Sequence, residues 1–408
     1  MKQPTIAIIG GGAAGMVAAL AASGPGARVE LYEAQPRLGK KLLATGNGRC
    51  NFSHKGFSKA NYHGGHVGFV SPAFAVHDEA DTLAFFEGLG LAVMTDERDR
   101  YYPQSLQAQA VLDLLRLALD EAGINVHTDT RIAKILPTPA GFDLGRGRRA
   151  DAVVVATGGE AAPALGGTRD GYELLTALGH SLVPTAPGIV QLVCDLGPLK
   201  ACKGLKRVCG LTICADGKPV ATDHGEILIT SYGLSGPPVL QCAGAAVRAL
   251  NGDAKVQACI SFFPGLGETA LLDQLTSRRD AHPNRDAAAF FVGMLPRLLA
   301  QSVLKRTGVA IHGALDDASL KKIARTLCQW SLPVKGPRPF SDAQVTLGGI
   351  DTADFDSDTL GSWLVPGLFA AGEVLDIDGD CGGYNLQWAW SSGRLAGRSA
   401  WDYVTQQK

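Results

Sequence analysis

The chain has 408 residues, 46% of them apolar, and nearly balanced formal charge, with 38 Lys+Arg against 39 Asp+Glu. This length predicts two or three domains, and the charge balance excludes a global field that would recruit nucleic acid or a membrane. None of the nine cysteines forms a CxxC pair or a zinc-like Cys/His cluster, so no metal site is predicted. Their odd number, without a signal peptide, predicts a cytoplasmic protein.

The first elements in chain order form a βαβ unit. Residues 5–9 (TIAII) are typical of a buried strand, residues 16–23 of a helix and residues 28–33 of a second strand. Gly10, Gly12 and Gly15 lie between the first strand and the helix, and Glu33 ends the second strand. This spacing predicts a dinucleotide site, with the pyrophosphate at the helix N-terminus and the acid on an unphosphorylated ribose, as in FAD or NAD.

The following segments predict a domain split by an insertion. Ser105 is expected to cap a helix that runs to about Glu121, and residues 150–159 read as a buried strand ending in a glycine turn. Short alternating strands follow to about residue 265, and helical periodicity takes over from 267 to 332. Strand character returns at Leu364, before a glycine-rich loop and a helix from about 386 to 404. The fold class is therefore α/β, a doubly wound Rossmann-like domain with a β-barrel-like plus helical insert. The predicted boundaries are 1–186 with 341–408 for the Rossmann-like domain, 187–266 for the antiparallel β insert and 267–340 for the helical subdomain.

The C-terminal stretch "GLFAAGEVLDIDGDCGGYNLQWAW" favours FAD over NAD. A strand leads into Gly372 and Glu373, and further glycines precede the last helix. The chain thus builds a second helix N-terminus with acidic side chains, which a single pyrophosphate does not need. A cofactor with a polar ribityl arm and a flat ring does, so the first predicted domain is an FAD-binding domain.

These motifs together resemble the BaiN/YhiN-like flavoproteins, a branch of the glutathione-reductase-type FAD fold. The residues that carry the resemblance are "IIGGGAAGMVAA", "LGKKLLATGNGRCN", "VVVATGG", "TRDGYELLTALGH", "GLSGPPVL", "VTLGGI" and "GEVLDIDGDCGGYNLQWAWSSG", and they extend over almost the whole chain. The resemblance implies FAD contacts along the chain. These are Gly10, Gly12, Ala13, Ala14 and Gly15 for the pyrophosphate, Glu33 for the ribose, Lys41, Thr45, Gly46, Asn47, Gly48, Arg49, Cys50 and Asn51 along the flavin, Ala156, Thr157 and Gly158 near the adenosine, Thr346, Gly348 and Gly349 near the ring, and Gly372, Glu373, Asp376, Gly383, Tyr384, Asn385 and Leu386 for the ribityl chain and ring.

The loop "TGNGRCN" (45–51) holds the two candidate catalytic residues. Related flavoprotein disulfide reductases carry a CxxxxC redox pair in this segment, but here Lys55 stands where the second thiol would be. The loop therefore supplies hydrogen-bond donors and not a disulfide. Arg49 is expected to anchor the flavin or the substrate, with a structural salt bridge as the alternative. Cys50 is either a proton donor or a packed bystander.

The resemblance implies hydride transfer through flavin N5, with reduction of an activated C=C bond as the leading function. Only one dinucleotide fingerprint is present, so NAD(P)H is expected as a transient electron donor, unless electrons come from elsewhere. The alternatives are an oxidase or dehydrogenase of a small amine or alcohol, and a flavoprotein that acts on ribosomal RNA. The substrate is expected to be a small molecule, without a membrane partner; the sequence does not fix the oligomeric state. An RNA partner would use a basic face of the insert, formed by Lys200, Lys203, Lys206, Arg207, Arg278, Arg279, Lys305, Arg306, Lys321, Lys322 and Arg325.

Overall fold

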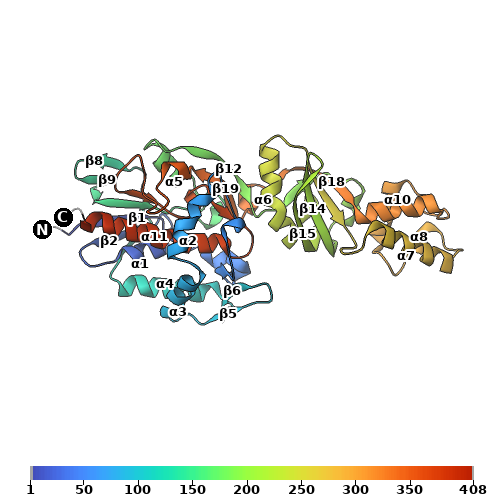
Figure 1. Ribbon diagram of the computed structural model, residues 1–408, viewed down its shortest axis with the longest axis horizontal. Coiled ribbons are helices and arrows are strands. Elements are labelled where there is room, and N and C mark those ends of the chain that lie inside the picture. Colours follow the sequence, from blue (N-terminus) through green and yellow to red (C-terminus); the bar gives the residue numbers. More distant parts are fainter. Residues whose placement is uncertain (1–2, 407–408) are drawn as a thin grey trace. The chain divides into compact units, whose positions relative to one another are not determined.

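The computed structural model describes residues 3–406, and the chain divides into two compact units. The first unit joins both ends of the chain, Met1–Ala186 and Gln344–Lys408, and the second is the segment Pro187–Ala343. Each unit is built around its own sheet system (Figure 1).

The first unit is centred on a five-stranded parallel sheet with the strand order β20-β11-β1-β2-β7. The central strand β1 is buried along its whole length, and Ile6 pairs with Val29 on one side and Ala152 on the other. Burial of both faces explains the continuous apolar runs from which these strands were predicted. The strand bounds are β1 Thr5–Ile9, β2 Arg28–Tyr32, β7 Asn125–His127, β11 Ala152–Val155 and β20 Leu368–Ala370.

Helix α1 (Ala13–Ala22) follows β1 and packs against the last helix, α11 (Tyr384–Gln406), so the two chain ends share one core (Figure 1). The two backbones approach closely at two glycines. A Cβ atom on Gly393 would lie 2.4 Å from the carbonyl oxygen of Ala14, and one on Gly397 would lie 2.2 Å from that of Ala18. No larger residue fits at either position without moving the helices apart.

Replacement of Gly397 by alanine is therefore expected to destabilise the protein by roughly 2–3 kcal/mol, because the added methyl group overpacks the α1–α11 contact. Urea unfolding measures the change. The matched control is Gly88→Ala in α3 (Glu79–Gly88), where the new Cβ meets nothing within 4 Å. The control should leave stability unchanged or raise it by up to about 1 kcal/mol, as expected for an open helical glycine. Equal effects of the two substitutions would contradict the close packing of α1 and α11.

Smaller elements complete the first unit. Its remaining helices are α2 Val70–Val76, α4 Ala108–Glu121 and α5 Asp170–Thr176. Its remaining strands are β3 Ser53–His54, β4 Tyr62–His63, β5 Val93–Thr95, β6 Arg100–Pro103, β8 Leu136–Thr138, β9 Gly141–Gly145, β10 Arg148–Ala150, β19 Val345–Ile350 and β21 Asp378–Gly379. Strand β12, Leu182–Gly188, begins in this unit and ends with the first two residues of the second.

The predicted cap of helix α4 at Ser105 is wrong. The helix begins at Ala108, after Gln107, and has no side-chain cap. Leu106 has a φ of 53°, in the left-handed region, so a helix cannot run through it from Ser105.

The second unit contains a closed barrel with the strand order β13-β16-β15-β14-β17-β18, which confirms the barrel-like insert. The strands are β13 Leu192–Cys194, β14 Lys206–Ala215, β15 Lys218–Ile229, β16 Gly233–Ser235, β17 Val256–Ser261 and β18 Trp330–Pro337. Strand β18 lies within the segment predicted as the helical subdomain, yet it pairs with β13 and β17 and closes the barrel. One segment between the barrel strands β17 and β18 therefore contains four helices: α7 Glu268–Ala281, α8 Ala287–Phe290, α9 Arg297–Thr307 and α10 Asp317–Cys328.

Helix α6 (Pro237–Asn251) was not predicted in this segment. It packs against β14 to β18 through a buried face that includes Val239, Ala243 and Val247. The sequence "GPP" reads as a turn, but the two prolines occupy the first helical turn, where a missing N–H costs nothing. Within residues 3–406, no helix of either unit combines the length and the apolar character needed to cross a bilayer.

Candidate functional site

A cavity of about 610 Å³ in the first unit lies at the carboxyl ends of the parallel sheet. Residues at or just beyond the ends of all five strands line it: Gly10 after β1, Glu33 after β2, Thr130 beyond β7, Ala156 after β11 and Ala371 after β20. In open α/β sheets this edge is the expected place for a ligand, where neighbouring connections diverge from the sheet.

The turn between β1 and α1 forms one wall of the cavity. Gly10 N donates to Tyr32 O at 2.8 Å, which fixes the turn against β2, and α1 begins without a side-chain cap. The free amides of the first helical turn and the helix dipole favour an anion there. A Cβ atom on Gly12 would meet nothing within 4 Å, so the cavity is open at this point, as the close approach of a pyrophosphate requires.

Glu33 occupies the next position along the wall. Its two carboxylate oxygens accept from the backbone amides of Gly11 and Gln35, both at 2.7 Å. These bonds orient the carboxylate at the end of β2. Each oxygen retains a further lone pair, so the carboxylate can still accept from the hydroxyls of a ribose.

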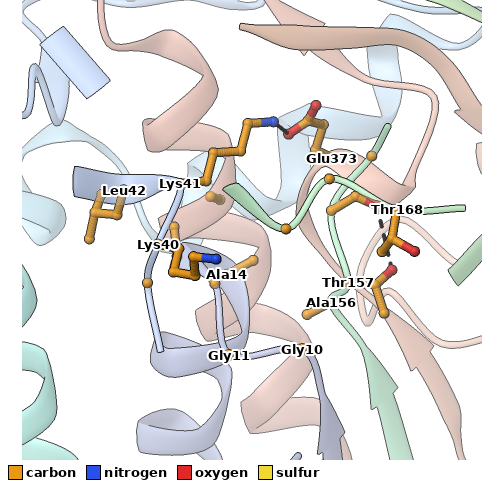
Figure 2. Close-up of a pocket in the computed structure, with 18 of the residues that line it drawn as sticks. Gly10, Gly11, Ala14, Lys40, Lys41, Leu42, Ala156, Thr157, Thr168 and Glu373 are labelled. Atoms are coloured by element: carbon orange, nitrogen blue, oxygen red, sulfur yellow. Dashed lines mark hydrogen bonds and ion pairs between the residues drawn. The ribbon is translucent and has the colours of Figure 1, made fainter. Parts of the chain in front are cut away.

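A second acid, Glu373, lies on the wall contributed by the C-terminal part of the chain. Lys41 Nζ donates to Glu373 Oε2 at 2.7 Å, and the amide of Thr346 donates to Glu373 Oε1 at 2.8 Å. Figure 2 shows the Lys41 side chain extended to this carboxylate, with Gly10, Gly11 and Ala14 on the opposite part of the wall. The ion pair thus joins the segment after β2 to the segment after β20.

Asn385 and Trp388 of α11 complete this part of the cavity. The Asn385 side chain accepts from Gly379 N at 2.8 Å and donates to Gly379 O at 2.7 Å, which closes the glycine-rich loop onto the helix. Trp388 is 1% exposed, and its Nε1 donates to Gly372 O at 3.2 Å. An apolar wall and a fixed loop therefore meet at the start of α11.

The cavity brings together many of the predicted FAD contacts. Those that line it are Gly10, Gly12, Ala13, Ala14, Glu33, Lys41, Thr45, Ala156, Thr157, Gly158, Glu373, Asn385 and Leu386. Those that do not line it are Gly15, Gly46, Asn47, Gly48, Arg49, Cys50, Asn51, Thr346, Gly348, Gly349, Gly372, Asp376, Gly383 and Tyr384.

Several of the predicted residues that do not line the cavity stabilise the loops that form its wall. A Cβ on Gly15 would lie 1.8 Å from Gly10 O, so this glycine permits the turn itself. Thr346 is buried, and its hydroxyl accepts from Ala161 N at 3.0 Å. Asp376 is buried and accepts from Gly65 N at 2.8 Å. These positions hold the loops that reach the cavity.

The structure does not favour Cys50 as a proton donor. Its side chain is 0% exposed, and burial raises the pKa of the thiol to about 12. Such a group neither meets a ligand nor gives up its proton readily, which agrees with the alternative of a packed residue. Arg49 is exposed and does not line the cavity.

Sequence reasoning missed the wall formed by residues beyond β7 and before α5. The cavity residues that were not predicted include Gly11, Tyr32, Gln35, Arg37, Lys40, Thr130, Arg131, Thr168, Asp170 and Trp388. Arg131 donates to both carboxylate oxygens of Asp170, at 2.7 and 2.6 Å. Burial opposes ionisation of Asp170, but hydrogen bonds from Arg131 and Thr168 outweigh it and lower the pKa. The position of Thr130 just beyond a parallel strand was the available signal.

Three of the eleven basic residues of the insert that were predicted as an RNA-contacting face, Arg278, Arg279 and Arg306, make well-defined contacts within the unit. Arg278 donates to the carbonyls of Phe290 and Val292, and Arg279 pairs with Asp280 and Asp317. Arg306 donates to Ser331 O and lies over the ring of Trp330. These contacts give the RNA face no structural support.

The parallel sheet, the strand-end cavity and the open turn before α1 define an FAD-binding Rossmann-type fold, as predicted. A profile of the HI0933-like protein Rossmann domain matches residues 4–399, and the chain belongs to this family. The chain is 35% identical to the 3-dehydro-bile acid delta(4,6)-reductase of Clostridium scindens, over 97% of this chain and 98% of that protein. It is 30% identical to the ribosomal RNA dihydrouridine synthase of Escherichia coli, over 96% of each chain.

A solved structure agrees on the fold. The 3-ketosteroid delta1-dehydrogenase of Sterolibacterium denitrificans superposes with a TM-score of 0.50, at 10% identity, over 98% of this chain and 99% of that one. At this identity the likeness concerns the fold alone.

Proposed function

We propose that the protein is an FAD-dependent oxidoreductase that reduces an activated C=C bond of a small molecule, with NAD(P)H as the transient electron donor. The cavity at the five strand ends supports the FAD most directly, because its open turn, its ribose acid and its C-terminal wall suit the parts of FAD. The relative from Clostridium scindens is named as a reductase of a bile acid, over nearly the full length of both chains. The nine cysteines, all free thiols, support a reducing, cytoplasmic location.

The residues that would hold the cofactor follow from the cavity. The amides at Gly12 to Ala14 would bind the pyrophosphate, Glu33 the ribose, and the segment around Glu373 and Asn385 the ribityl arm. When bound, FAD supplies the hydride chemistry. Leu42, Leu386 and Trp388 line the cavity with apolar surface and would exclude water from it.

The name of the Escherichia coli relative keeps ribosomal RNA as a second candidate substrate. The reaction type is the same, because a uridine also carries a C=C bond next to a carbonyl group. The small molecule remains the leading candidate, because the relative named as a bile acid reductase is 35% identical and the RNA-modifying relative 30%.

Anaerobic rapid mixing tests the proposal. The FAD-loaded protein should lose its flavin absorbance on mixing with NADH or NADPH and recover it on mixing with a 3-oxo-4-ene bile acid, with slow recovery in air. Fast recovery in air would favour an oxidase instead. Recovery only with a ribosomal RNA transcript would favour the RNA substrate. No loss of absorbance with either nicotinamide would contradict the assignment of the electron donor.

A further inference from the structure

Two loops run from the cavity wall to a cluster of side chains outside it, within the first unit. Thr45 lines the cavity and is followed by residues 46–51, and Asn385 lines the cavity and is preceded by residues 379–384. The loops touch, since a Cβ on Gly383 would lie 2.7 Å from Asn51 Oδ1. Tyr384 stacks on His54 with ring centroids 4.7 Å apart. The junction of the two loops therefore lies next to two residues of the cavity wall, Thr45 and Asn385.

The phenol ring of Tyr102 is the platform of this surface. The guanidinium carbons of Arg49 and Arg100 lie 5.5 and 5.7 Å from its centroid. Tyr102 itself is only 3% exposed, so its ring is fixed. Cationic groups over an aromatic ring are stabilised by the ring's quadrupole, and the platform sets the position of both arginines.

The two arginines differ in how their charge is balanced. Arg100 donates to Asp96 Oδ2 through Nε at 2.9 Å and through Nη2 at 2.6 Å. Burial opposes ionisation of Asp96, but the hydrogen bonds from Arg100 outweigh it and lower the pKa of the carboxyl. Arg100 therefore has a fixed, fully charged partner.

Arg49 has no such partner. Its Nε donates to Gly46 O at 3.3 Å, and across residues 3–406 no carboxylate lies within 4.0 Å of its nitrogens. The bond at Nε leaves the terminal nitrogens free for an acceptor. A planar guanidinium that is oriented by a ring and lacks an anion is suited to a carboxylate, which it binds through two parallel hydrogen bonds.

We propose that Arg49 anchors a carboxylate group of the substrate, so that the substrate class is an activated alkene that also carries an acid. This inference rests on the proposed function, because it assigns the substrate of the same site. Arg49 lies four residues after Thr45 of the cavity wall, and the anchor acts on a part of the substrate remote from the double bond. Arg49 is thus a specificity residue that binds and orients the substrate.

Equilibrium binding to the oxidised, FAD-loaded protein tests the anchor without turnover. The probes are a 3-oxo-4-ene bile acid and its methyl ester, which differ only in the charge of the side chain. The wild-type protein should bind the acid at least tenfold more tightly than the ester. Arg49→Met should abolish this preference by lowering the affinity for the acid, with the affinity for the ester unchanged. Arg49→Lys should restore part of it. Arg98→Met is the matched control, since Arg98 is an exposed arginine of the segment before Arg100 with no place on the Tyr102 ring. The control should bind both probes as the wild type does.

Kinetics separate the anchor from the proposed function. Where the acid is turned over, Arg49→Met should raise its KM at least tenfold with kcat nearly unchanged, and leave the rate of reduction by NADH and NADPH as in the wild type. If Arg49→Met slowed only the reduction by NADPH, the anion bound by Arg49 would be the phosphate of NADPH, and the proposal would be overturned. Equal binding of acid and ester by the wild type would overturn it as well. Wild-type protein that binds the acid through Arg49 but reduces neither probe would refute the proposed reaction and leave the anchor standing.

Discussion

Replacing Gly12 by alanine is expected to weaken FAD binding at least about 100-fold, while the apoprotein keeps its stability to within about 1 kcal/mol. The new methyl group meets no protein atom within 4 Å, so it costs the fold little. It enters the open part of the cavity where the pyrophosphate would pass. Fluorescence titration with FAD measures the affinity, and thermal unfolding of the apoprotein measures the stability.

Gly15→Ala provides the contrast. Its Cβ would lie 1.8 Å from Gly10 O, so the turn between β1 and α1 must move. This variant should lose FAD binding and also lose roughly 2–3 kcal/mol of apoprotein stability, because the displaced atoms belong to the backbone. Wild-type affinity for FAD in Gly12→Ala would contradict the placement of the pyrophosphate at this turn.

Changes to the Lys41–Glu373 pair are expected to shift the midpoint potential of the bound flavin in opposite directions. Lys41→Met leaves the Glu373 carboxylate unpaired in the cavity wall, where its charge opposes the addition of electrons, so the potential should fall. Glu373→Gln leaves the Lys41 cation unpaired, so the potential should rise. Each change should alter the ratio of reduced to oxidised cofactor about tenfold, which is about 30 mV for a two-electron couple.

The double variant and a neighbouring lysine serve as controls. With both charges removed, the potential should return close to that of the wild type. Lys40 also lines the cavity, but its Nζ donates to the neutral Gln35 side chain at 3.0 Å. Lys40→Met removes the same charge as Lys41→Met, but beside Glu33 at the proposed ribose end of the cavity, so it should shift the potential less. Shifts of the same sign in Lys41→Met and Glu373→Gln, measured by anaerobic titration with reference dyes, would refute the electrostatic role of the pair.

The fold could be predicted where local pattern and tertiary structure agree. The buried strands at residues 5–9 and 152–155 are continuous apolar runs, and the last helix was placed within two residues of its start at Tyr384. Helix α6 was missed because prolines at its first turn look like a break in sequence. The helical pattern expected from 267 to 332 is interrupted around Met294, and α9 begins only after Pro296, which adopts an extended ψ of 139°.

Site residues could be predicted where they lie directly after a recognisable strand in the sequence. They could not be predicted where their place in the cavity depends on the order of the strands in the sheet. The Gly10 turn, Glu33 and the Glu373 segment each lie directly after a recognisable strand. The wall at Thr130 and Arg131 belongs to the cavity only because β7 pairs next to β2, which no local pattern reveals. The burial of Cys50 depends on its left-handed φ of 58° and on packing around it, and neither is visible in "TGNGRCN".

The absorption spectrum of the purified wild-type protein tests the central claim most directly. The two chain ends form one cavity for FAD, so the protein should be yellow, or become so on incubation with FAD, and should release one FAD per chain when denatured. A correctly folded protein that is colourless and takes up no FAD would contradict this account.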